Sequence, residues 1–145
     1  MSPQTLLDHT DSGRLWPAPL SARPGYDLAA AHADALQVHR LRLARGERVR
    51  GYKVGFTNRG IWPIYNVFAP IWGFVWDTTL SHDNGEGVLA LGTACQPRLE
   101  PEAVFGLRAT PPAGATLQGL FDALDWVAPG FEVVQSHLPD WRFQA

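Results

Sequence analysis

Two acidic residues on either side of a proline are the first candidates for chemistry: Glu100 and Glu102 in Glu100-Pro101-Glu102. In an extended backbone, residues i and i+2 point to one face, roughly 7 Å apart. Two carboxylates at that spacing repel each other unless a positive group lies between them, and a hard divalent cation would meet that need. The alternative is a pair of solvated surface acids beside a proline turn. The apolar run that follows favours a position near the core for at least one of them.

Glu132 is a third acidic candidate, because it interrupts the otherwise apolar segment 129–134. In an alternating strand it would lie on the solvent face. If it is buried instead, its charge needs a cationic partner. The spacing alone leaves both interpretations open.

Lys53 and Asp77 are weaker candidates. Lys53 stands in a strand-like segment between Gly51 and Gly55. Its ammonium group can simply reach solvent along the flexible stem, or the flanking glycines can let a ligand approach the backbone. Asp77 follows Trp76 directly, and a turn or cap residue is the more common role for an aspartate at such a place.

Other catalytic signatures are absent from the sequence. It contains no HExxH, no Cys/His zinc spacing, no GxSxG, no Walker loop and no GxGxxG. These absences leave the acidic residues as the main chemical signal.

The elements that must position these residues follow from periodicity and turn signals. A helix is predicted from Asp27, its N-cap, to Ala44, with Gly46 ending it. A shorter helix is possible around Leu6, and another is predicted from Thr116 to Val127. Strands are predicted over 49–56, 70–76, 88–91, 102–108 and 131–136, with a hairpin signal at 83–85.

This order of elements predicts an α+β fold with a mixed or antiparallel sheet. We divide the chain into a helical segment, residues 1–48, and a β-rich domain, residues 49–145, that contains all five candidate residues.

Composition excludes several classes of protein. Hydrophobic residues make up 46% of the chain and charged residues 18%, with a net charge of −2, so no basic surface for nucleic acid is expected. No apolar run reaches the length of a membrane helix, and the N-terminus lacks a secretory pattern. The single cysteine, Cys95, excludes an internal disulfide. We therefore expect a cytoplasmic protein with neither a nucleic-acid nor a membrane partner.

Read together, several segments resemble one family. The segments are Gly51-Tyr52-Lys53-Val54-Gly55-Phe56-Thr57, Pro70-Ile71-Trp72-Gly73, Trp76-Asp77-Thr78-Thr79, Pro97-Arg98-Leu99-Glu100-Pro101-Glu102, Asp125 to Val134 and Asp140-Trp141. Their order and intervals resemble the 2-keto-4-pentenoate hydratases, with the related 4-oxalocrotonate decarboxylases and 2-oxohept-4-ene-dioate hydratases, of the fumarylacetoacetate-hydrolase superfamily. The resemblance runs from about residue 27 to the end.

The resemblance implies that Glu100, Glu102 and Glu132 hold one Mg²⁺ or Mn²⁺, with Lys53 and Asp77 as an acid/base pair near it. It implies a small-molecule 2-keto acid substrate, which would be a 2-hydroxy-2,4-dienoate hydrated to a 4-hydroxy-2-oxo acid in aromatic catabolism. Decarboxylation, C–C hydrolysis and a non-catalytic remnant remain alternatives.

Family members are much longer than these 145 residues. The resemblance therefore implies the N-terminal half of a fumarylacetoacetase-type domain that is truncated here. We expect such a fragment to be weakly stable, with reduced or no activity, and the full-length protein to be a homo-oligomer.

Overall fold

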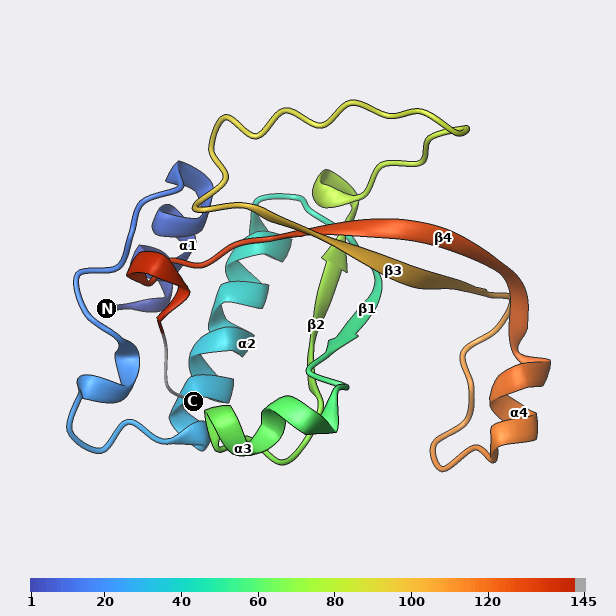
Figure 1. The fold of residues 1–145 in the computed structure, drawn as a ribbon, viewed down its shortest axis with the longest axis horizontal. Coiled ribbons are helices and arrows are strands. Elements are labelled where there is room, and N and C mark those ends of the chain that lie inside the picture. Colours follow the sequence, from blue (N-terminus) through green and yellow to red (C-terminus); the bar gives the residue numbers. More distant parts are fainter. Residues whose placement is uncertain (143–145) are drawn as a thin grey trace. The chain divides into compact units, whose positions relative to one another are not determined.

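The computed structural model describes residues 1–142 (Figure 1), and these residues form an α+β protein, as predicted. Its helices are α1 (Pro3–Ser12), α2 (Leu28–Ala44), α3 (Trp62–Tyr65) and α4 (Leu117–Asp122); its strands are β1 (Val49–Gly55), β2 (Ile71–Trp76), β3 (Arg98–Leu107) and β4 (Leu124–Val134). Short 3₁₀ turns lie at Leu20–Ala22, Arg59–Ile61, Asp77–Thr79 and Pro139–Trp141. Across residues 1–142, no helix has both the length and the apolar character that crossing a bilayer requires.

The chain folds into two compact units. The first contains Met1–Gln96 and residues 136–142, and the second contains Pro97–Gln135. Each unit has one antiparallel pair of strands, β1 with β2 and β3 with β4. The predicted boundary after residue 48 stays a prediction, and residues 143–145 of the predicted β-rich domain lie outside the described part of the chain.

Helix α2 confirms the clearest prediction from the sequence. Asp27 caps it by accepting a hydrogen bond from the Ala30 amide at 2.8 Å, and Gly46 follows its end at φ +96°, a backbone conformation that suits glycine. The helix contacts β2 through His39, whose ring stacks on Phe74 at a centroid distance of 4.1 Å. This aromatic contact helps to join helix and strand pair in the first unit.

A buried ionic cluster lies where α2 meets β1. Glu47 is 7% exposed and accepts hydrogen bonds from Arg42 at 2.6 Å, from Thr78 at 2.7 Å, and from Arg45. Arg42 also lies over the ring of buried Trp76, 4.5 Å from its centroid. Burial by itself would raise the pKa of Glu47, but the hydrogen bonds from Arg42, Thr78 and Arg45 outweigh it and lower the pKa to about 2.

In the second unit, β3 and β4 form a long ribbon. The pairing runs from Arg98 opposite Val134 to Leu107 opposite Leu124, with a bulge after Gly106. The connection carries α4, which Thr116 caps by accepting from the Gly119 amide at 3.1 Å.

Two predictions of secondary structure were wrong. The helix expected from Thr116 to Val127 ends at Asp122, because the chain from Leu124 onward pairs with β3 and becomes strand. Cross-strand pairing outweighs the local helical pattern there. The strand expected over 88–91 and its hairpin are not formed in the described structure. Val88 is fully exposed and Leu89 is 61% exposed, so this apolar run gains little burial that would hold it as a strand.

The Glu47 cluster predicts a pH-dependent contribution to stability. A folded-state pKa of about 2, below the usual 4.5, stabilises the fold fully above pH 4.5, and this contribution is lost as the pH falls toward 2. We expect Glu47→Gln to lower the free energy of unfolding by about 3 kcal/mol at pH 7, with the difference shrinking below pH 4.5. Urea unfolding at several pH values measures it. Glu86→Gln, at an exposed residue, is the control, and a pH-independent difference would contradict the assignment.

Candidate metal centre

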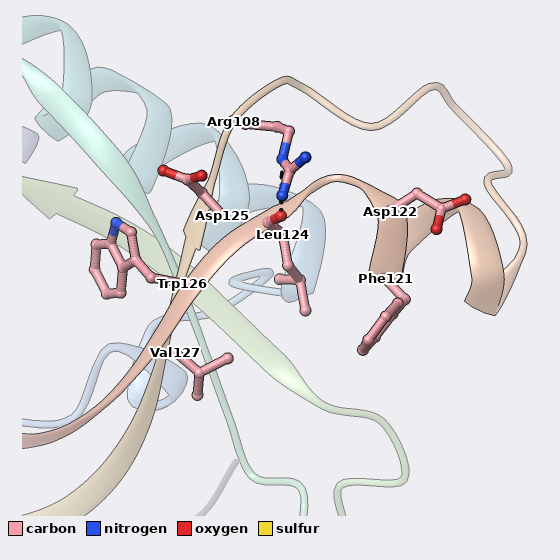
Figure 2. Close-up of a pocket in the computed structure, with 7 residues that line it drawn as sticks. All are labelled: Arg108, Phe121, Asp122, Leu124, Asp125, Trp126 and Val127. Carbon is pink, nitrogen blue, oxygen red and sulfur yellow. Dashed lines mark hydrogen bonds between the residues drawn. The ribbon is translucent and has the colours of Figure 1, made fainter.

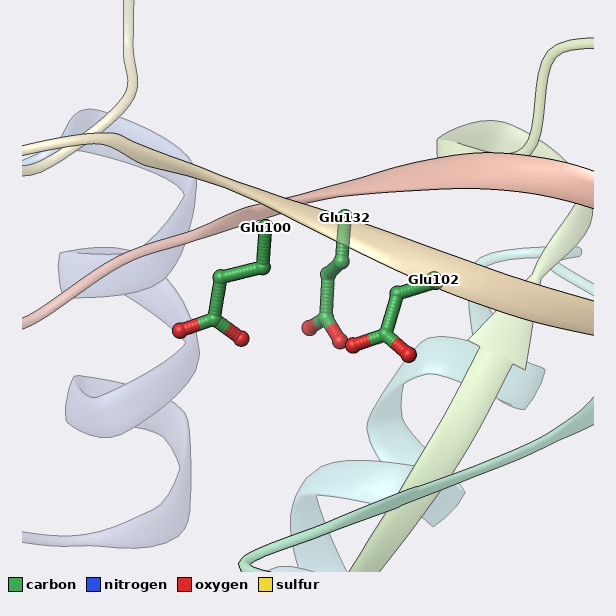
Figure 3. Close-up of side chains that lie close together, drawn as sticks. All are labelled: Glu100, Glu102 and Glu132. Atoms are coloured by element: carbon green, nitrogen blue, oxygen red, sulfur yellow. The ribbon is translucent and has the colours of Figure 1, made fainter.

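Three carboxylates converge on one face of the β3–β4 ribbon. Glu100 and Glu102 come from β3 and Glu132 from β4, and one carboxylate oxygen from each lies within 4.8 Å of the others (Figure 3). The register explains the convergence, because Glu100 lies directly opposite Glu132, and Glu102 lies opposite Gly130. The predicted placement of Glu100 and Glu102 on one face is confirmed.

The exposure of these residues differs from expectation. Glu100 and Glu102 are both exposed, so the prediction that at least one lies near the core was wrong. The residues that suggested burial, Ala103 to Phe105, are themselves exposed on this ribbon. Glu132 is half-buried, between the two alternatives that the sequence left open.

The arrangement suits a hard cation. Like charges directly opposite each other on neighbouring strands destabilise a sheet, and a divalent ion removes that penalty. Oxygens bound to one Mg²⁺ lie at most about 4.2 Å apart, and those bound to one Ca²⁺ about 5 Å apart. The oxygens lie within 4.8 Å of one another, so small side-chain rotations would bring all three to the spacing that one such ion requires. The three carboxylates together fit the expected oxygen ligand set.

Lys53 and Asp77 belong to the first unit. Lys53 is an exposed residue of β1, opposite Gly73 of β2, and its Cε lies 3.2 Å from where a Cβ at position 73 would be. Glycine at that position therefore leaves the space that the lysine stem occupies. Its proposed role in catalysis stays a prediction.

Asp77 acts locally as a cap. Its Oδ1 accepts a hydrogen bond from the Arg48 amide at 2.9 Å, and its own amide donates to the Arg48 carbonyl at 2.9 Å. These two bonds close the end of the β1–β2 pairing. The turn or cap role that the sequence suggested is observed, and the acid/base role stays a prediction.

A separate open hollow lies at the other end of the ribbon, beside α4 (Figure 2). Arg108 lines this hollow. Its Nε donates a hydrogen bond to the Leu124 carbonyl at 2.9 Å, so the guanidinium group joins the end of β3 to the start of β4. Trp126 lines the hollow and is paired with Gly106 of β3. Gly106 is four residues from Glu102, which is roughly 13 Å along a strand. The hollow is therefore distinct from the carboxylates, which are the stronger candidate site.

Comparisons with known proteins support the resemblance seen in the motifs. No family model matches the chain. It is 34% identical to a 2-hydroxyhexa-2,4-dienoate hydratase of Comamonas testosteroni, over 93% of this chain and 55% of that protein. It is 33% identical to a 2-hydroxypent-2,4-dienoate hydratase of Pseudomonas putida, over 87% of this chain and 57% of that protein. The chain spans about half the length of the curated relatives it matches.

A solved structure shows the same fold. The 4-oxalocrotonate decarboxylase from Pseudomonas putida G7, complexed with magnesium and adipate, superposes with a TM-score of 0.86 at 24% identity. The match covers 98% of this chain and 54% of that one. The expected similarity to hydratases and decarboxylases of this group is confirmed.

The carboxylate cluster predicts one site for a divalent ion per chain. We expect Mn²⁺ to bind with one-to-one stoichiometry, measured by electron paramagnetic resonance, and Mg²⁺ to compete for the same site. Loss of a side chain that only hydrogen-bonds to a metal ligand already costs about 10- to 100-fold in metal affinity, so Glu102→Gln, which changes a direct ligand, should weaken binding by at least about tenfold. Glu86→Gln, outside the cluster, is the matched control. Equal Mn²⁺ affinity in wild type and Glu102→Gln would refute this site.

Proposed function

We propose that this chain supplies the metal-binding strands of a divalent-metal-dependent hydratase, which adds water to a 2-hydroxy-2,4-dienoate to give a 4-hydroxy-2-oxo acid. The convergence of Glu100, Glu102 and Glu132 carries the proposal. The similarity to two dienoate hydratases supports the choice of substrate class and its place in aromatic catabolism. Because the chain spans about half of those relatives, the activity of the whole protein is part of the proposal.

The ion we propose is Mg²⁺ or Mn²⁺. When bound, it supplies Lewis acidity to a chelated 2-oxo acid. Glu100, Glu102 and Glu132 would hold the ion through their carboxylate oxygens, and an ion with six or more oxygen ligands would keep positions for the carboxylate and 2-oxygen of the ligand. The magnesium in the decarboxylase structure of the same fold supports this choice.

Charge balance supports a role for Lys53. Three carboxylates and one divalent ion sum to −1, and a bound 2-oxo acid adds another negative charge. An ammonium group beside the substrate would offset part of that charge as it grows during enolisation. We propose that Lys53 stabilises this charge or transfers the proton at C3 of the substrate.

We propose Asp77 as the second member of the acid/base pair. Its Oδ1 is engaged by the Arg48 amide, so Oδ2 is the oxygen that would exchange a proton. The same hydrogen bond orients the carboxylate, because it fixes the side chain against the end of β1. Asp77 would then combine a structural and a chemical task.

A decarboxylase is the second candidate function. The chain is 31% identical to a 4-oxalocrotonate decarboxylase of a Pseudomonas species, and the solved structure of the same fold is a decarboxylase as well. The carboxylate site does not choose between the reactions, since stabilising an enolate serves hydration, decarboxylation and C–C hydrolysis alike. The products differ: hydration consumes only water, whereas decarboxylation releases CO₂.

We further propose a truncated, fumarylacetoacetase-type β-rich domain, and a homo-oligomer for the longer protein. A cytoplasmic location and low turnover by the 145-residue chain itself belong to the same proposal. The chain spans about half the length of each of these relatives. A non-catalytic chain that only binds the ion remains the alternative that the next experiment addresses.

Enolisation can be tested without full turnover. We expect the Mg²⁺-loaded chain to exchange the C3 hydrogens of 2-oxopentanoate with deuterium, followed by proton NMR. Positioned acid/base groups contribute about 10²- to 10⁴-fold, so Lys53→Met should slow the exchange by at least about 100-fold. Arg50→Met, which removes an exposed cation from the same strand, is the control.

The outcomes separate the candidate functions. Exchange at equal rates in wild type and Lys53→Met would remove Lys53 from the mechanism. Mn²⁺ binding without any exchange would support a non-catalytic cation-binding chain. With 2-hydroxypenta-2,4-dienoate and 4-oxalocrotonate as substrates, loss of dienoate absorbance against release of CO₂ distinguishes a hydratase from a decarboxylase.

A further inference from the structure

The ribbon face that carries the carboxylates becomes apolar immediately beyond them. Antiparallel pairing puts directly opposed residues on the same face, and alternate residues share that face. Along it, in order, lie four cross-strand pairs: Glu100 with Glu132, Glu102 with Gly130, Val104 with Ala128, and Gly106 with Trp126. The carboxylate end of this face is thus followed by a short apolar strip, formed by the pairs Val104 with Ala128 and Gly106 with Trp126.

The side chain of Val104 extends toward the carboxylate end of this face. Its Cγ2 lies 2.6 Å from the position that a Cβ would occupy at Gly130, and Gly130 is the residue opposite Glu102. Because Gly130 has no side chain, a methyl group of Val104 can lie beside the cross-strand pair of Glu102 and Gly130. Val104 remains 37% exposed, so a ligand can reach it.

We propose that Val104, lying in the space left by Gly130, is the residue that selects the hydrocarbon chain of a bound 2-oxo acid. This inference rests on the proposed function, in which the three carboxylates hold the ion that the acid chelates. The chain of such an acid would run from the carboxylates along the strip and contact the valine methyls. The substrate class is then a 2-oxo acid with a short apolar chain.

Distance along the strand makes Val104 the discriminating residue rather than Trp126. Alternate residues of a strand are roughly 7 Å apart, so Val104 is one such step from Glu102, and the pair of Gly106 with Trp126 is two steps, roughly 13 Å, away. A chain of three or four carbons beyond the chelating oxygens is shorter than one such step, so its end can touch the Val104 methyls but cannot reach Trp126. Trp126 packs on Gly106 instead, close enough to fill the place of a Cβ there.

The experiment compares 2-oxo acids that differ only in chain length. Isothermal titration calorimetry with saturating Mg²⁺ measures the affinities of oxalate, which has no chain, and of pyruvate, 2-oxobutanoate and 2-oxopentanoate. Each buried methylene stabilises binding by about 0.8 kcal/mol, a factor of about four in affinity. We expect a gain of that size per added carbon in wild type, and a gain below twofold in Val104→Ala.

Two further variants locate the effect. Gly130→Ala keeps Val104 but places a Cβ where its methyl lies, so we expect it to reduce the gain per carbon as Val104→Ala does. Val127→Ala makes the same change on the opposite face of the ribbon, at the residue paired with Phe105, and should keep the wild-type gain.

The outcomes distinguish this inference from the proposed function. If oxalate binds only with Mg²⁺ and the gain per carbon disappears in Val104→Ala and Gly130→Ala alone, the inference is supported. If oxalate binds but all variants show the same gain, Val104 does not select the chain, although the metal site stands. If oxalate does not bind even with Mg²⁺, the proposed function fails and the inference fails with it.

Discussion

The candidate site depends on one constraint, the register between β3 and β4. Glu100 and Glu132 meet because they are directly opposed, and Glu102 joins them because it is two residues along the same strand. A slip of one residue would turn Glu132 to the other face of the ribbon and scatter the cluster. This register brings three like charges together. Their repulsion destabilises the strand pairing, and a bound cation would offset it.

The two faces of this ribbon have opposite character. One carries the carboxylates and the strip of Val104, and the other carries large apolar side chains such as Leu99 at 63% and Phe131 at 71% exposure. A two-stranded ribbon is marginally stable by itself, and exposed apolar patches commonly mark interaction surfaces.

Charge is used differently in the first unit. Glu47 is buried, satisfied by two arginines and a hydroxyl, and tied to the ring face of Trp76 through Arg42. Its low pKa follows from that structural role. The contrast with the exposed glutamates of β3 shows why burial and partner type, rather than residue type, separate a structural charge from a candidate ligand.

The sequence by itself determined the helix from Leu28 to Ala44, the strands around Lys53 and Phe74, and the same-face placement of Glu100 and Glu102, because these follow from local periodicity and capping. Only the tertiary structure decided that the chain from Leu124 is strand, that residues 88–91 are not, and that Glu132 lies directly opposite Glu100, a grouping that the sequence implied only through the family resemblance. Nothing in the sequence indicated that the Val104 side chain occupies the space left by Gly130. Each of these depends on which strand lies opposite, and cross-strand partners far apart in the chain leave no local signal.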